Sequence, residues 1–118
     1  MQRIIPIAAL ACALASSPAF AHAFLDKAIP AVGSTVNGSP SELQLSFTEN
    51  VVPAFSGVRV TAEGGGSVPA GKPTLGPANT LHVRLGHALK PGVYEVSWHV
   101  ISVDTHHTSG TYRYTVAP

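Results

Sequence analysis

Residues 93–116 read VYEVSWHVISVDTHHTSGTYRYTV and contain the two most strand-like segments of the chain. In 93–102 and again in 110–116, apolar and polar residues alternate at period two, which predicts two half-buried β-strands. Further segments with strand character lie at 24–29, 43–47, 57–62 and 80–85. Gly and Pro interrupt the sequence between these segments too often for a helix to form.

The spacing of these segments predicts an all-β domain. With at most a short edge strand in 64–76, they give about seven strands separated by turn signals, which is typical of an antiparallel sandwich or barrel. We expect Trp98, Tyr112 and Tyr114 in its core, and loops at 31–40 and 102–110. A loop at the end of a rigid β scaffold is a common place for function.

The first 21 residues have the pattern of a secretory signal peptide. Arg3 precedes an uncharged, largely apolar run at 4–15, and Ala19-Phe20-Ala21 is an A-x-A cleavage site. The apolar run is shorter than the roughly 20 residues that span a bilayer, so no stable membrane anchor is expected. Cleavage after Ala21 makes 22–118 the mature domain, whereas the alternative site Ala21-His22-Ala23 removes His22. We favour the first cut because it lies closer to the apolar run.

The composition of the mature chain excludes several functions. Removing 21 of the 118 residues leaves 97, and the loss of Arg3 leaves six basic against six acidic residues. A chain without net charge gives no indication of binding to nucleic acid or to an anionic membrane surface. Cys12 and Met1 are the only residues of their types, so the mature chain contains no disulfide, thiolate or thioether.

Three residues form a candidate metal site. Asp104 and His106 are two residues apart, so in an extended segment their side chains project to the same side and His107 points elsewhere. Ser102 and Thr108 are candidates to orient this pair through hydrogen bonds. If His22 is the mature N-terminus, its α-amine and imidazole form one chelate. Three nitrogens and one carboxylate oxygen favour Cu(II), although Zn(II) accepts the same ligands.

The same residues also fit an account without metal. Asp104 is a common turn residue, and an Asp-x-His loop often carries only a solvated histidine. His82, His87 and His99 are interpreted as solvated or surface residues, and Glu49 as a surface charge at a strand end. On these residues alone, a structural β domain without metal therefore stays open.

Several segments in order resemble the CopC family of exported copper-binding proteins. They are HAFL (22–25), PAVGS (30–34), LSFTE (45–49), FSGV (55–58), LKPGVY (89–94), VSW (96–98), SVDTH (102–106) and SG (109–110). The resemblance implies an antiparallel Greek-key β-barrel or sandwich, of immunoglobulin or cupredoxin-like type, with about seven strands. It also implies one Cu(II) per chain, bound by His22, Asp104 and His106, with Glu49 nearby as a second-shell group.

The resemblance implies a periplasmic binding protein rather than an enzyme. Such a protein sequesters Cu(II) in copper resistance or homeostasis, or delivers it to an inner-membrane copper transporter of the CopD type. Some family members also bind Cu(I) through a Met-rich segment, but the corresponding region 61–75 has no Met. The alternative is an oxidative copper enzyme, because polysaccharide monooxygenases also chelate copper through an N-terminal histidine. That chemistry needs open coordination positions and a broad polysaccharide-binding face.

Overall fold

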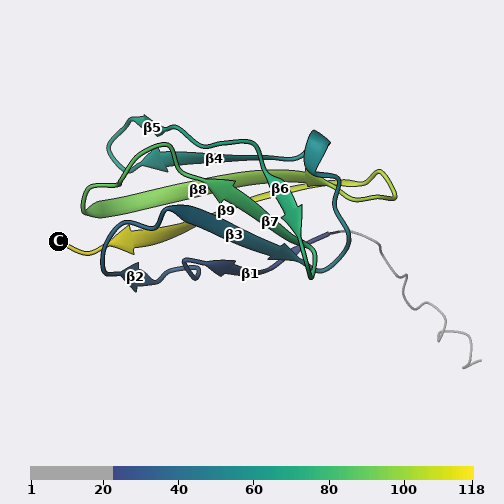
Figure 1. Ribbon diagram of the computed structural model, residues 1–118, viewed down its shortest axis with the longest axis horizontal. Coiled ribbons are helices and arrows are strands. Elements are labelled where there is room, and N and C mark those ends of the chain that lie inside the picture. The colour runs from purple at the N-terminus through teal and green to yellow at the C-terminus, as the bar shows by residue number, and fades with distance from the viewer. Residues whose placement is uncertain (1–22) are drawn as a thin grey trace, which may run out of the picture.

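The computed structural model describes residues 23–118, which fold into two packed β-sheets (Figure 1). The five-stranded sheet has the order β2-β9-β8-β4-β5 and the four-stranded sheet the order β1-β3-β7-β6. The strands are β1 (Leu25–Ile29), β2 (Thr35–Val36), β3 (Glu42–Phe47), β4 (Gly57–Ala62), β5 (Ser67–Val68), β6 (Thr74–Gly76), β7 (Thr80–Arg84), β8 (Gly92–Ile101) and β9 (His107–Val116). A short 3₁₀ helix, η2 (Pro53–Phe55), precedes β4.

The core lies between the sheets and contains the residues that the alternation places inward. Its main members are Leu43, Leu45, Phe47, Val60, Leu81, Val83, Tyr94, Val96, Trp98, Val100, Tyr112, Tyr114 and Val116. Fully burying a side chain such as Leu or Val stabilises a fold by about 1.5–3 kcal/mol. Phe47 and Trp98 join the two sheets, with ring centroids 5.2 Å apart and an edge-to-face angle of 69°. The predicted positions of Trp98, Tyr112 and Tyr114 are therefore confirmed.

The predicted all-β architecture is confirmed, with two differences among the edge strands. The expected loop at 31–40 contains β2, which pairs in parallel with β9 through Thr35 opposite Thr115. The 64–76 segment contributes β5 and β6, one to each sheet, where at most one edge strand was expected. These short strands are defined by their neighbours, because two or three residues are too few to show a period of their own.

The predicted loop at 102–110 is too long. β8 and β9 remain paired antiparallel as far as Ile101 opposite His107, so β9 begins three residues before Gly110. The connection is a tight turn over 102–106. Figure 1 shows this turn, η2 and the first described residues at one end of the sandwich, opposite the C-terminus. Segments from the start, middle and end of the sequence therefore meet at that end.

Candidate metal centre

The turn at 102–106 is held by backbone hydrogen bonds. Ser102 N donates to His106 O at 2.9 Å, and Thr105 N donates to Ser102 O at 2.8 Å. Thr105 has a φ of +73°, in the left-handed region that is costly for a β-branched residue. Our prediction of an extended segment is therefore wrong here, because the chain reverses between Asp104 and His106.

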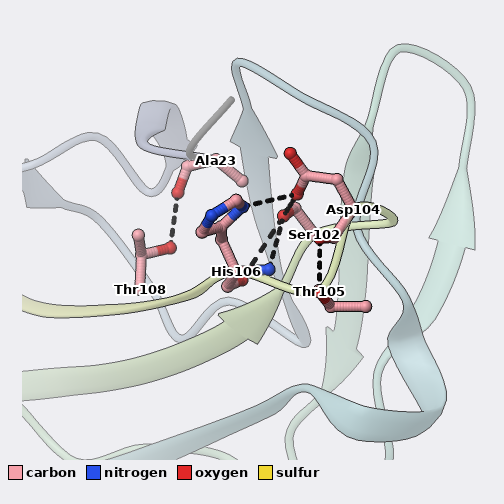
Figure 2. Close-up of polar contacts among 6 residues, drawn as sticks. All are labelled: Ala23, Ser102, Asp104, Thr105, His106 and Thr108. Atoms are coloured by element: carbon pink, nitrogen blue, oxygen red, sulfur yellow. Dashed lines mark hydrogen bonds and ion pairs between the residues drawn. The ribbon is translucent and has the colours of Figure 1, made fainter. Parts of the chain in front are cut away.

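Asp104 and His106 nevertheless face each other across this turn. His106 Nδ1 lies 3.1 Å from Asp104 Oδ1, and both side chains are partly exposed. The buried Ser102 donates its hydroxyl to the same carboxylate oxygen, as Figure 2 shows. This hydrogen bond, and then the contact with His106, hold the pKa of the Asp104 carboxyl below its ordinary value of 3.8. An anionic oxygen and an imidazole nitrogen are therefore presented together. His107, in contrast, is exposed at the start of β9 opposite Ile101.

The first described residues, Ala23 and Phe24, form an N-terminal arm beside this pair. Thr108 Oγ1 donates to Ala23 O at 2.6 Å, as Figure 2 shows, and Thr108, in β9, follows His106 by two residues. Phe24 N donates to Thr48 Oγ1 at 3.0 Å, and Thr48 N donates to Phe24 O at 2.9 Å. Ala23 has no exposed surface. The arm is therefore fixed to both sheets, because Thr48 follows β3 and Thr108 lies in β9.

The two expected orienting hydroxyls have different roles. Ser102 contacts the pair as predicted: besides its bond to Asp104, its Oγ lies 3.3 Å from His106 N and 3.3 Å from His106 O. Thr108 instead binds Ala23, because it sits on the inward side of β9 rather than in the turn. No local pattern indicates this contact, because it joins residues 85 positions apart.

The remaining predicted site residues are His22 and Glu49. His22 lies outside the described residues. Glu49 is exposed, follows Thr48 directly, and has no hydrogen bond or ion pair with any of residues 23–118. Within residues 23–118, no three His, Cys, Asp or Glu side chains are gathered as a metal-binding group. The described part of the chain thus contributes a pair of ligand-type groups and the arm beside them.

The other histidines lie away from this end or make different contacts. His82 was expected to be solvated, but its Nδ1 lies 2.7 Å from Glu42 Oε2. The error arose because Glu42 is 40 residues away in sequence and reaches His82 only through the β3–β7 pairing. His87 is exposed, with its Nδ1 2.8 Å from Ala88 O, and His99 is an exposed residue whose ring covers Gly57.

The two-sheet fold and the Asp104–His106 turn define a small all-β protein with a candidate metal centre at one end. Within that class, the chain belongs to the CopC domain family, whose sequence profile matches residues 25–117. Protein YobA of Escherichia coli (strain K12) is 38% identical over 113 residues, covering 93% of this chain and 90% of YobA. Copper resistance protein C of Xanthomonas campestris pv. juglandis is 34% identical over 114 residues, covering 91% and 89%.

Solved structures agree with this assignment. The crystal structure of PcoC, a methionine-rich copper resistance protein from Escherichia coli, matches with a TM-score of 0.73 at 32% identity, covering 81% of this chain and 99% of PcoC. That of CopC from Methylosinus trichosporium OB3b matches with a TM-score of 0.76 at 30% identity, covering 82% and 95%. The family and its members establish a copper-related function for the chain.

A longer relative contains a similar segment. Copper transport protein CutJ of Bacillus subtilis (strain 168) is 28% identical over 99 residues, which are 82% of this chain but 18% of CutJ. Separately, no helix within residues 23–118 is long and apolar enough to cross a membrane.

Proposed function

We propose that the chain is an exported protein that binds one Cu(II) through His22, Asp104 and His106. His22 would supply its α-amine and its imidazole, Asp104 a carboxylate oxygen, and His106 an imidazole nitrogen. The observation that carries the proposal is the position of Ala23, the chain neighbour of His22. Thr108 holds Ala23 beside the Asp104–His106 pair, and consecutive Cα atoms are only about 3.8 Å apart.

The donor set suits Cu(II) in particular. Three nitrogens and one oxygen without sulfur match the tetragonal preference of Cu(II), whereas Cu(I) prefers thiolate and thioether ligands. PcoC is a methionine-rich copper resistance protein, but the only Met of the present chain is Met1. We infer that the chain binds copper in the Cu(II) state and has no separate Cu(I) site.

The proposal requires cleavage of residues 1–21 as a signal peptide, so that the mature domain is 22–118 in the periplasm. The role of Ala23 in the fold supports this cut over the alternative one. Ala23 is fully buried and its carbonyl accepts a hydrogen bond from Thr108. A chain that began at Phe24 would lose this anchored residue together with His22.

The proposed role is to hold Cu(II) and to pass it on in copper resistance or homeostasis. CutJ, a copper transport protein by name, contains a segment similar to this chain, which supports an inner-membrane copper transporter of the CopD type as the recipient. Glu49 is proposed to hydrogen-bond His22, since its neighbour Thr48 is bonded to Phe24. We propose no catalytic step, because Asp104 as a ligand fills a coordination position that oxidative chemistry needs.

A Cu(II) titration of the mature chain tests this function. It compares two variants, each of which replaces one of two adjacent histidines by alanine. His106→Ala should weaken Cu(II) binding by on the order of 100-fold or more, since it removes a ligand and not only its support. His107→Ala changes a neighbouring residue that starts β9 and should leave the affinity unchanged. Equal affinities for the two variants would exclude His106 as a ligand and contradict the proposed site.

A further inference from the structure

Two threonine hydroxyls hold the N-terminal arm from opposite sides. Thr108 Oγ1 donates to Ala23 O at 2.6 Å, and Thr48 Oγ1 accepts from Phe24 N at 3.0 Å. The first contact spans 85 residues of sequence and the second spans 24. Thr48 follows the four-stranded sheet and Thr108 belongs to the five-stranded sheet, so the arm connects the two layers at the end that carries Asp104 and His106.

A chain terminus needs such attachment if it is to be ordered. The first residues of most domains fray unless hydrogen bonds or packing hold them, and ordering them on ligand binding weakens the apparent affinity. Here the attachment involves only side chains and backbone of the protein itself. Thr48 N also donates to Phe24 O at 2.9 Å, and Ala23 has no exposed surface. The arm is thus held by contacts within the protein itself.

We infer that Thr48 and Thr108 are positioning residues for copper: they hold the N-terminal arm so that the mature N-terminus is already beside Asp104 and His106. This inference rests on the proposed function, in which His22 is a ligand. Neither threonine touches the metal in this account. Each raises the fraction of molecules whose arm is docked, and the apparent dissociation constant varies inversely with that fraction.

Hydrogen exchange in the metal-free mature chain measures arm docking directly. Thr108→Val keeps the size of the side chain and removes the hydroxyl, so the docking equilibrium should fall by about two- to tenfold, the effect of one lost hydrogen bond. The Phe24 amide, whose bond to Thr48 is untouched, should then exchange faster by that factor, while the amides of β8 are unchanged. Thr108→Ser restores the hydroxyl and should restore the protection of Phe24.

Thr111→Val is the matched control, because Thr111 lies in the same strand, is exposed and has no side-chain hydrogen bond within the described structure. It should leave the exchange of Phe24 at the wild-type rate. Unchanged exchange of Phe24 in Thr108→Val, or equal acceleration in both variants, would overturn the inference.

Copper binding provides the second readout. The double variant Thr48→Val/Thr108→Val should bind Cu(II) about tenfold more weakly than the wild type, since two bonds of the arm are lost. Wild-type affinity in the double variant would overturn the positioning role and leave the proposed function intact. If the wild type itself shows no Cu(II) binding that depends on His22, the proposed function fails, and the exchange experiment still decides whether the threonines hold the arm.

Discussion

Gly110 allows the indole of Trp98 to lie over β9, and a methyl group at this position should displace the ring. The two residues are direct partners in the β8–β9 pair. A Cβ atom on Gly110 would lie 2.7 Å from Trp98 Cζ2 and 3.0 Å from Cε2. Carbon atoms in contact are ordinarily about 3.5–4.0 Å apart. Since Trp98 is buried and packed edge-on against Phe47, it has little room to move.

Gly110→Ala should therefore destabilise the mature domain. Overpacking of a core costs about 1–3 kcal/mol, and the smaller conformational entropy of Ala in the unfolded chain offsets about 0.4–1 kcal/mol of this. We expect a net loss of about 1–2 kcal/mol in the free energy of unfolding. For a domain of this size, that lowers the melting temperature by roughly 5–15 °C.

Urea unfolding followed by tryptophan fluorescence is a clean assay, because Trp98 is the only Trp in the chain. Gly71→Ala is the matched control, since a Cβ on Gly71 would meet only Arg84 O at 3.7 Å. It should change the free energy of unfolding by less than about 0.5 kcal/mol. If Gly110→Ala unfolds at the wild-type urea concentration with the wild-type emission maximum, Trp98 does not occupy this space and the packing argument is wrong.

Three further predictions concern pH. Ser102, and then His106, lower the pKa of Asp104 from its ordinary value of 3.8. The ionised carboxyl therefore stabilises the fold fully above pH 3.8, and this stabilisation disappears as the pH falls through the lowered pKa. The melting temperatures of the metal-free wild type and Asp104→Asn should converge on acidification below about pH 4, and a constant difference would contradict this. Burial raises the pKa of Tyr114 to about 12 and also raises the pKa of Tyr112. The stability of the fold should therefore decline as the pH rises above 10.0, the ordinary pKa of these phenols. Phenolate absorbance from these two residues at pH 10, while the circular dichroism is still native, would refute this. Cu(II) affinity should drop steeply below about pH 6, where protons compete for amine and imidazole nitrogens, whereas equal affinity at pH 5 and pH 7 is incompatible with this ligand set.

The sequence predicts those parts of the fold in which local pattern and tertiary environment agree. β8 and β9 are buried on one face only, so their alternation identifies both the strands and inward residues such as Val96 and Tyr114. β2 has no such pattern, because its two residues are a strand only through their pairing with Thr115 and Val116. A feature created by a distant neighbour leaves no local periodicity.

The candidate site divides in the same way. Asp104 and His106 are close in sequence, so their proximity was predicted, although a left-handed Thr105 brings it about rather than an extended strand. The contact of Thr108 with Ala23 joins residues 85 positions apart and was not predictable from spacing. The pairing of His82 with Glu42 likewise depends on strand register. Long-range hydrogen bonds of this kind become visible only once the sheets are assembled.

The central claim is that the α-amine of a processed N-terminal His22 is a copper ligand. An electron paramagnetic resonance titration with Cu(II) should compare the chain that begins at His22 with one that carries a single added Gly before it. The added residue keeps every side chain but moves the amine out of its chelate with the imidazole. We predict a changed Cu(II) spectrum and an affinity lower by on the order of 100-fold. Identical spectra and affinities for the two chains would show that the amine takes no part and would contradict the account.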